Sequence, residues 1–214
     1  MLDGLARRLL DPPLARAGRA LARAGVGADA VTLAGFLAGL AAAAAVAGGA
    51  DPWALALLGA SRILDGLDGA VAGATRRTDR GGLLDIVCDF AFYGAVPLAF
   101  AVRDPAPNAL PAAALLFAFY VNGASFLAYA AVAAKRGLET ARRGAKSIYF
   151  TAGLAEGTET IACFAAAMIW PSLFPALAYG FALLTLASAA ARVALAWRSF
   201  EEPARPVAPE RRSA

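Results

Sequence analysis

Apolar residues run along this chain in six long blocks, separated by short polar or helix-breaking segments. Each block is roughly 20 residues long, the length an α-helix needs to cross about 30 Å of hydrocarbon. The pattern therefore predicts an all-α, polytopic membrane protein with six transmembrane helices. We place these spans at about 30–48, 52–74, 82–102, 109–134, 148–170 and 172–197.

The segment before the first block alternates arginine with leucine. Five arginines lie within residues 1–24, and no apolar run there is long enough for the core of a signal peptide. Either an amphipathic helix on the membrane surface or a solvated basic leader fits, with a break or kink at Pro12-Pro13. We expect one membrane domain over 1–200, in which 1–28 form an interfacial leader. The Pro- and charge-rich segment 201–214 is expected to be a disordered cytoplasmic tail.

The composition supports a membrane protein and removes several kinds of catalysis. Hydrophobic residues make up 60% of the chain and charged residues 17%, against about 25% charged residues in soluble domains. The chain has no histidine, which excludes Ser-His-Asp and Cys-His catalysis as well as His-ligated metal sites. Cys88 and Cys163 lie in apolar blocks, so we expect free, buried thiols rather than a disulfide.

Lysine and arginine gather on one side of the predicted membrane. With a cytoplasmic N-terminus, that side holds the basic residues of the leader, of 75–80, of 135–146 and of the tail, whereas the opposite side holds only Arg103. Positive residues favour the cytoplasmic side, and an even number of spans then places both termini in the cytoplasm. The net charge of +4 is therefore an orientation signal, and we expect no nucleic-acid partner.

Four carboxylates lie inside the second and third predicted spans, where an unpaired charge costs several kcal/mol. Asp65 and Asp68 are three residues apart, and Asp85 and Asp89 are four apart, so each pair shares one face of its helix. The short connection between the spans places all four acids at overlapping depths near the cytoplasmic surface. Divalent cations would relieve their repulsion, and two Mg²⁺ or Mn²⁺ ions would balance four charges through oxygen ligands.

Both the acids and the glycines beside them also have an explanation without a ligand. The acids could instead form ion pairs with nearby arginines, namely Arg62, Arg76, Arg77 and Arg80. Gly69 and Gly73 form a GxxxG pattern, which either packs against a neighbouring helix or leaves a smooth wall for a nucleotide.

Residues 65–89 resemble the signature of the CDP-alcohol phosphatidyltransferase family, D-x2-D-G-x2-A-R-x7-8-G-x3-D-x3-D. The matching positions are Asp65, Asp68, Gly69, Ala72, Gly81, Asp85 and Asp89. The six spans and the basic interfacial leader are also similar to this family. One position departs, because Gly73 stands where the family has an arginine that is associated with the phosphates of the CDP-lipid. Either Arg76 or Arg77, one turn on, supplies this charge, or binding of the donor is weakened.

The resemblance implies an integral membrane enzyme that transfers a phosphatidyl group from a CDP-linked lipid, such as CDP-diacylglycerol, to an alcohol with release of CMP. It implies two metal ions held by Asp65, Asp68, Asp85 and Asp89, with Asp89 also acting as general base. The residues implied at the donor are Gly69, Ala72, Gly73, Arg76, Arg77 and Thr78. A homodimer in the cell (inner) membrane is also implied. The rival hypotheses are a non-catalytic scaffold of the same fold and an ion-coupled transporter.

The sequence defines the acceptor less sharply than the donor. Glu156 and Glu159 lie three residues apart in the fifth predicted span, where they could bind a polyol or a cationic acceptor, or pair with Arg192. Basic residues near the presumed entrance either reflect membrane orientation or capture a phosphorylated alcohol; they are Lys135, Arg142, Arg143 and Lys146. Glycerol phosphate, inositol phosphate, inositol, serine and choline are the acceptors left open.

Overall fold

The computed structural model describes residues 3–136 and 157–200, and outside short turns these residues form helices. The elements are α1 (Asp3–Arg23), α2 (Ala28–Ala47), α3 (Asp51–Ala74), α4 (Asp79–Arg103), α5 (Pro105–Lys135), α7 (Gly157–Ile169), the 3₁₀ turn η1 (Pro171–Leu173) and α8 (Phe174–Phe200). No strand occurs within the described ranges. The all-α prediction is therefore confirmed.

Four segments of the described chain are long and apolar enough to cross a membrane: α2, α4, α5 and Pro171–Arg198. α3 has 24 residues, but three charged side chains, Arg62, Asp65 and Asp68, interrupt its apolar character. α7 covers the end of the fifth predicted span, whose residues 148–156 lie outside the described part. A multi-pass membrane protein is thus supported, while the number of six spans stays a prediction.

The predicted break at 103–108 is wrong in its extent. α5 begins at Pro105, directly after Asp104. Proline fits the first turn of a helix because the N–H it lacks has no helical partner there. The side-chain amide of Asn108 also donates a hydrogen bond of 3.0 Å to the carbonyl oxygen of Phe100, which closes the turn between α4 and α5. α1 likewise continues through Pro12-Pro13 without a break.

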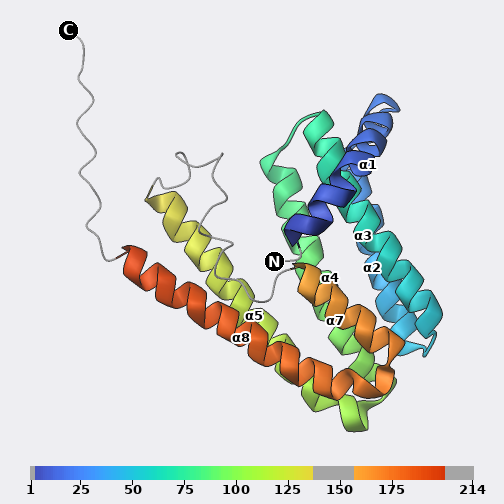
Figure 1. The fold of residues 1–214 in the computed structure, drawn as a ribbon, viewed down its shortest axis with the longest axis vertical. Helices are drawn as coiled ribbons and strands as arrows, with labels where there is room; N and C mark the ends of the chain where they lie inside the picture. The colour runs from blue at the N-terminus through green and yellow to red at the C-terminus, as the bar shows by residue number, and fades with distance from the viewer. Residues whose placement is uncertain (1–2, 137–156, 201–214) are drawn as a thin grey trace.

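The helices form two groups, which Figure 1 shows in one view. In the first group α2 packs against α3 and α4, and α1 covers α3. In the second group α5 and α8 run side by side, and their ends at Lys135 and Phe200 diverge from α3 and α4. α7 contacts both α3 and α8. Aromatic rings fill the core between the groups, where Phe100 and Phe174 stack with their centroids 4.2 Å apart.

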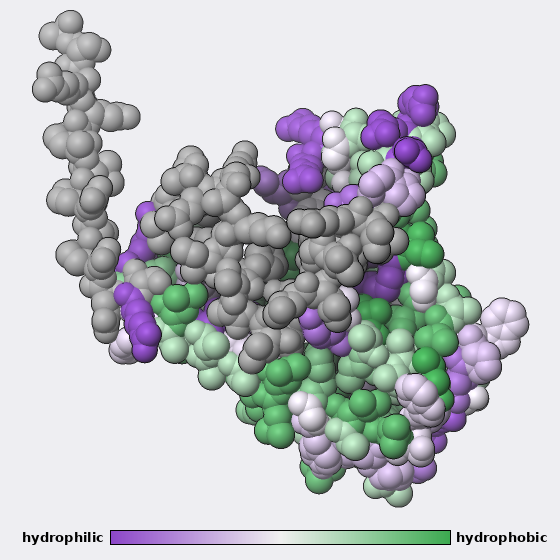
Figure 2. Space-filling view, in the orientation of Figure 1, coloured by the Kyte–Doolittle hydropathy of each residue, from purple (hydrophilic) through white to green (hydrophobic). Residues whose placement is uncertain are grey.

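α1 lies directly against α3 through small residues. A Cβ added at Gly18 would come within 2.7 Å of the Cβ of Ala70, and Leu14 contacts α3 at Gly66. Figure 2 shows polar residues gathered at the upper end of the visible face, where α1 and the α3–α4 turn lie, and apolar residues over much of the lower part. The position of α1 on a membrane surface stays a prediction.

An ion pair joins α3 and α4 at the end remote from this turn. Arg103, in the last turn of α4, contacts Asp51 in the first turn of α3 through both nitrogens of its guanidinium fork. The exposed fractions of the two side chains are only 26% and 23%. Gly49, with φ at +74°, provides the left-handed turn that leads into α3. The two helices are thus fixed to each other near Asp51 as well as through the short connection 75–78.

Candidate metal and donor site

Three carboxylates from α3 and α4 converge near the cytoplasmic end predicted for these helices. One oxygen each of Asp65, Asp85 and Asp89 can be chosen so that all lie within 4.8 Å of one another. The exposed fraction is 37% for the side chain of Asp65 and 31% for that of Asp89. Three anionic oxygens this close, and only partly hydrated, fit a hard divalent cation such as Mg²⁺ or Mn²⁺.

Asp68 lies one turn beyond Asp65 on α3 and is more deeply buried, with 8% exposure. Its Oδ2 atom is buried and has no hydrogen-bond partner among the described residues. Buried polar atoms nearly always have a partner, so this oxygen is available to a ligand. Asp68 is not part of the three-oxygen group, and it therefore borders the cluster rather than completing it.

One arginine enters the acid cluster from within α3. Nη1 of Arg62 lies 3.4 Å from Oδ1 of Asp65 and 3.3 Å from Oδ1 of Asp89. The alternative of ion pairing, which the sequence left open, is thus realised for these two acids. Sequence reasoning treated Arg62 only as a charge partner, although an arginine three residues before Asp65 inside an apolar span was a signal for a role in the site.

The other arginines near the α3–α4 connection do not pair with the cluster in the described part of the chain. Arg80 forms an ion pair of 3.4 Å with Asp29 at the start of α2. Arg76 and Arg77 lie beyond the end of α3, and both are exposed. Their side chains are therefore accessible to a ligand bound at the acid cluster.

The GxxxG glycines are open rather than packed. A Cβ added at Gly69 or at Gly73 would meet no atom within 4 Å, and both residues are exposed. Ala72, on the same helix, is half-buried. Helix packing at the GxxxG pattern is therefore not seen within the described residues, since α1 contacts α3 at Gly66 and Ala70 instead.

Thr78 caps α4 and so shapes the connection between the two acid pairs. Its Oγ1 accepts a hydrogen bond of 3.0 Å from the backbone N–H of Gly81. A Cβ at Gly81 would lie 3.1 Å from that hydroxyl and 3.2 Å from Oδ1 of Asp29, so the position has little room for a side chain. This crowding explains why a glycine occupies position 81 of the motif.

The residues considered for the acceptor are dispersed. Lys135 is exposed at the end of α5, and Glu159 is half-buried near the start of α7. Arg192 of α8 contacts α5, where its Nη1 donates to Oδ1 of Asn122 at 2.9 Å and to Oγ of Ser125 at 2.7 Å. The remaining predicted positions lie outside the described residues; they are Arg142, Arg143, Lys146 and Glu156.

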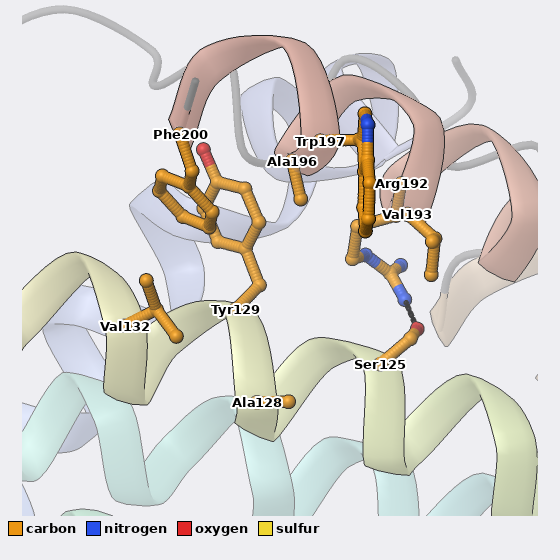
Figure 3. Close-up of a pocket in the computed structure, with 9 residues that line it drawn as sticks. All are labelled: Ser125, Ala128, Tyr129, Val132, Arg192, Val193, Ala196, Trp197 and Phe200. Atoms are coloured by element: carbon orange, nitrogen blue, oxygen red, sulfur yellow. Dashed lines mark hydrogen bonds between the residues drawn. The ribbon is translucent and has the colours of Figure 1, made fainter. Parts of the chain in front are cut away.

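A cavity of about 450 Å³ opens between α5 and α8 beside Arg192. Figure 3 shows its wall, in which Arg192 reaches across to Ser125 while Tyr129, Trp197 and Phe200 supply aromatic surface. None of the four acids lines this cavity. Both cysteine thiols are free, as predicted; Cys88 is buried as expected, whereas Cys163 is only half-buried.

Comparison with known proteins agrees with this geometry. The model of the CDP-alcohol phosphatidyltransferase family matches residues 26–197. The inner membrane protein YnjF of Escherichia coli (strain K12) is 43% identical over 174 residues, which are 81% of this chain and 84% of YnjF. Two crystal structures of the phosphatidylinositol phosphate synthase PgsA1 from Mycobacterium tuberculosis share the fold. The structure with CDP-DAG bound has a TM-score of 0.60 at 20% identity and covers 86% of this chain and 93% of PgsA1.

The second PgsA1 structure, in complex with manganese and citrate, has a TM-score of 0.61 at 22% identity and covers 86% of this chain and 88% of that one. The family match includes the motif at 65–89 and extends over most of the chain. The resemblance seen in the sequence is thereby confirmed: this chain belongs to the CDP-alcohol phosphatidyltransferase family.

Proposed function

We propose that this protein transfers a phosphatidyl group from a CDP-linked lipid to an alcohol and releases CMP, as a step of phospholipid synthesis. The observation that carries the proposal is the convergence of Asp65, Asp85 and Asp89, at the motif positions of the family, to within 4.8 Å. PgsA1 has been solved with CDP-DAG and with manganese. These two structures support a CDP-lipid donor and a divalent ion for a chain of the same fold.

Asp65, Asp85 and Asp89 would hold the metal, with Asp68 as a further ligand through its unpartnered Oδ2. Two Mg²⁺ or Mn²⁺ ions would balance the four negative charges of these acids. When bound, such ions neutralise the diphosphate of the donor and polarise the phosphorus that carries the lipid. Asp89 belongs to this group, so its carboxylate would lie next to the bound ion.

Asp89 acts in this proposal as the general base. Its carboxylate takes the proton of the acceptor hydroxyl while the hydroxyl oxygen forms a bond to the lipid-side phosphorus. The bond from that phosphorus to the bridging oxygen breaks, and CMP leaves with the electron pair. The remaining residues position the reactants and supply charge, which is sufficient for phosphoryl transfer without a protein nucleophile.

The donor would lie along the open wall of α3. Gly69, Ala72 and Gly73 leave room for the nucleotide, since nothing lies within 4 Å of a Cβ at either glycine. Arg76 and Arg77 are exposed just past the end of the helix. They would replace the arginine that the family has at position 73.

Thr78 completes the proposed donor site. Its hydroxyl oxygen accepts the hydrogen bond from the N–H of Gly81. The O–H group can therefore donate a hydrogen bond to the CDP-lipid.

The acceptor in this proposal is an alcohol. We infer whether it is anionic or neutral from Arg192, which lies outside the motif. Nε of Arg192 is buried without a hydrogen-bond partner in the described part of the chain. An anionic group, such as the phosphate of glycerol phosphate or inositol phosphate, would satisfy it. The further residues proposed for the acceptor are Lys135, Arg142, Arg143, Lys146, Glu156 and Glu159.

We further propose a multi-pass location in the inner membrane with both termini in the cytoplasm, and a homodimer. The distribution of lysine and arginine supports the orientation. The relative YnjF is an inner membrane protein, which supports the location. The acid cluster then opens toward the cytoplasmic side, where a soluble acceptor and a lipid donor can both reach it.

The decisive experiment measures CMP release from CDP-diacylglycerol by the purified full chain in detergent. Each candidate acceptor is tested with Mg²⁺, with Mn²⁺ and with excess EDTA. We expect CMP only when a divalent ion and the right alcohol are both present. Absence of CMP with every acceptor would favour the non-catalytic scaffold, for which Gly73 is the supporting feature. An ion-coupled transporter is disfavoured because the acids gather in one hairpin rather than in two repeated halves.

A further inference from the structure

Arg62 is unusual because its charge lies inside an apolar helix and within a cluster of acids. Only 19% of its side chain is exposed. A guanidinium carries its charge at every relevant pH, so its burial must be compensated by fixed partners. The structure provides three kinds of partner, namely carboxylates, a hydroxyl and an aromatic ring.

These partners hold the guanidinium in one place. Its Nη2 donates to Oγ of Ser61 at 3.0 Å, and that fully buried hydroxyl in turn donates to the carbonyl oxygen of Gly35 at 2.7 Å. The guanidinium carbon lies 4.6 Å from the centroid of the Phe92 ring, within the range of a cation–π contact. The arginine is therefore anchored to α2, α3 and α4 together.

The charged end of Arg62 occupies a position that bears directly on metal binding. Nη1 joins Asp65 on α3 to Asp89 on α4, at 3.4 and 3.3 Å. Both acids belong to the group whose oxygens could hold a metal ion. A cation already balances part of the charge that a divalent ion would neutralise, and it does so at two of the three carboxylates of that group.

We propose that Arg62 is an internal counter-cation of the acid cluster. It holds Asp65 and Asp89 together while no metal is bound, and it competes with the divalent ion for them. Arg62 is thus a positioning residue that sets the metal affinity of the site. This inference rests on the proposed function, since it requires Asp65, Asp85 and Asp89 to bind a divalent ion.

Two opposite effects follow from removal of the charge at Arg62. Metal affinity rises, because the ion no longer displaces an ion pair from Asp65 and Asp89. The metal-free protein becomes less stable, because the three acids then repel one another without compensation. Coupling between two bound groups typically changes an affinity about 5- to 150-fold, and we expect roughly tenfold tighter Mn²⁺ binding.

The test compares Arg62→Gln with wild type, using the full chain in detergent. Free Mn²⁺ is followed by electron paramagnetic resonance to obtain the dissociation constant, and melting is followed with and without Mn²⁺. We expect Arg62→Gln to bind Mn²⁺ about tenfold more tightly, to melt at a lower temperature without metal, and to recover with Mn²⁺. The matched control is Arg103→Gln, which breaks the ion pair at the other end of the same two helices. Arg103→Gln should melt at a lower temperature than wild type both with and without Mn²⁺, and its affinity for Mn²⁺ should be unchanged.

Two further variants keep the test decisive if Arg62→Gln does not fold. Arg62→Lys retains the charge, so its Mn²⁺ affinity should stay near that of wild type; affinity as high as that expected of the glutamine variant would contradict competition by charge. Ser61→Ala retains every charge but frees Nη2. Ser61→Ala should tighten Mn²⁺ binding, because the guanidinium of Arg62, which competes with the ion, is held less firmly. An unchanged dissociation constant for Mn²⁺ would overturn the proposal.

The outcomes separate this inference from the proposed function. Wild type that binds Mn²⁺, together with an Arg62→Gln variant that binds it equally or more weakly, refutes the role of Arg62 and leaves the metal site standing. Wild type that binds no Mn²⁺ refutes the metal site and the role of Arg62 together.

Discussion

The glycines of α1 and α3 allow one substitution to be compared in two opposite environments. In the free protein, Gly69→Ala adds a methyl group that meets nothing within 4 Å. Alanine is favoured over glycine inside a helix by about 0.8–1.0 kcal/mol. For a chain of this size, each kcal/mol changes the melting temperature by about 2–4 °C. We therefore expect Gly69→Ala to melt at the same temperature as wild type or slightly above it.

The same methyl group should weaken donor binding, because it narrows the wall along which we place the nucleotide. One misplaced methyl group in a binding pocket is worth about 1–3 kcal/mol, or roughly 10- to 200-fold. The effect should raise the KM for CDP-diacylglycerol and leave the KM for the acceptor unchanged. CMP release at varied donor concentration measures both constants.

Gly18→Ala is the matched control. Its new Cβ would lie 2.7 Å from the Cβ of Ala70 and 2.8 Å from the backbone carbon of that residue. Carbon atoms pack at about 3.5–4.0 Å, so α1 must move away from α3 by roughly 1 Å. Such overpacking costs about 1–3 kcal/mol and should lower the melting temperature in detergent. If Gly69→Ala melts as low as Gly18→Ala, or if its donor KM is unchanged, the open-wall interpretation of α3 is wrong.

Three other substitutions test the site and its support. Asp89→Asn should lower CMP release by about 10²- to 10⁴-fold with an unchanged helical circular dichroism spectrum; near-normal turnover would remove Asp89 from the role of base. Gly73→Arg has space for its side chain and should leave the donor KM nearly unchanged, because Arg76 and Arg77 already supply the charge in this proposal; a KM lowered about tenfold, as a new charge-assisted hydrogen bond of about 1.5–3 kcal/mol would cause, would show that they do not. Asp51→Asn leaves the half-buried Arg103 without its carboxylate and should destabilise the protein by roughly 1–3 kcal/mol, measured by melting, with normal turnover per folded molecule.

The sequence predicted helices and the grouping of acids well, because both follow from local periodicity. Spacing alone put Asp65 on one helix and Asp85 and Asp89 on the next, and a short connection left little freedom in their relative depth. The start of α5 was misplaced because a proline can either end a helix or begin one. The choice at Pro105 depended on the contact of Asn108 with Phe100, which spacing does not reveal.

Contacts between helices were the part that sequence reasoning could not fix. Gly66 and Gly69 look alike in the sequence, yet one faces Leu14 of α1 and the other faces open space. The pairing of Arg62 with Asp89 depended in the same way on the rotation of α4 against α3, whereas Arg62 and Asp65 lie three residues apart on one helix. Such rotations are set by side-chain packing over the whole bundle.

The short α3–α4 hairpin also bears on how the protein is made. All four acids and Arg62 lie within residues 62–89, and the ion pair between Asp51 and Arg103 closes the same hairpin. Contacts between neighbouring segments form faster than contacts between distant ones. The segment from Asp51 to Arg103 therefore contains the whole charged centre together with the ion pair that closes it. One helical pair can thus bring the acids and their counter-charge together through contacts close in sequence, without contacts from α5 or α8.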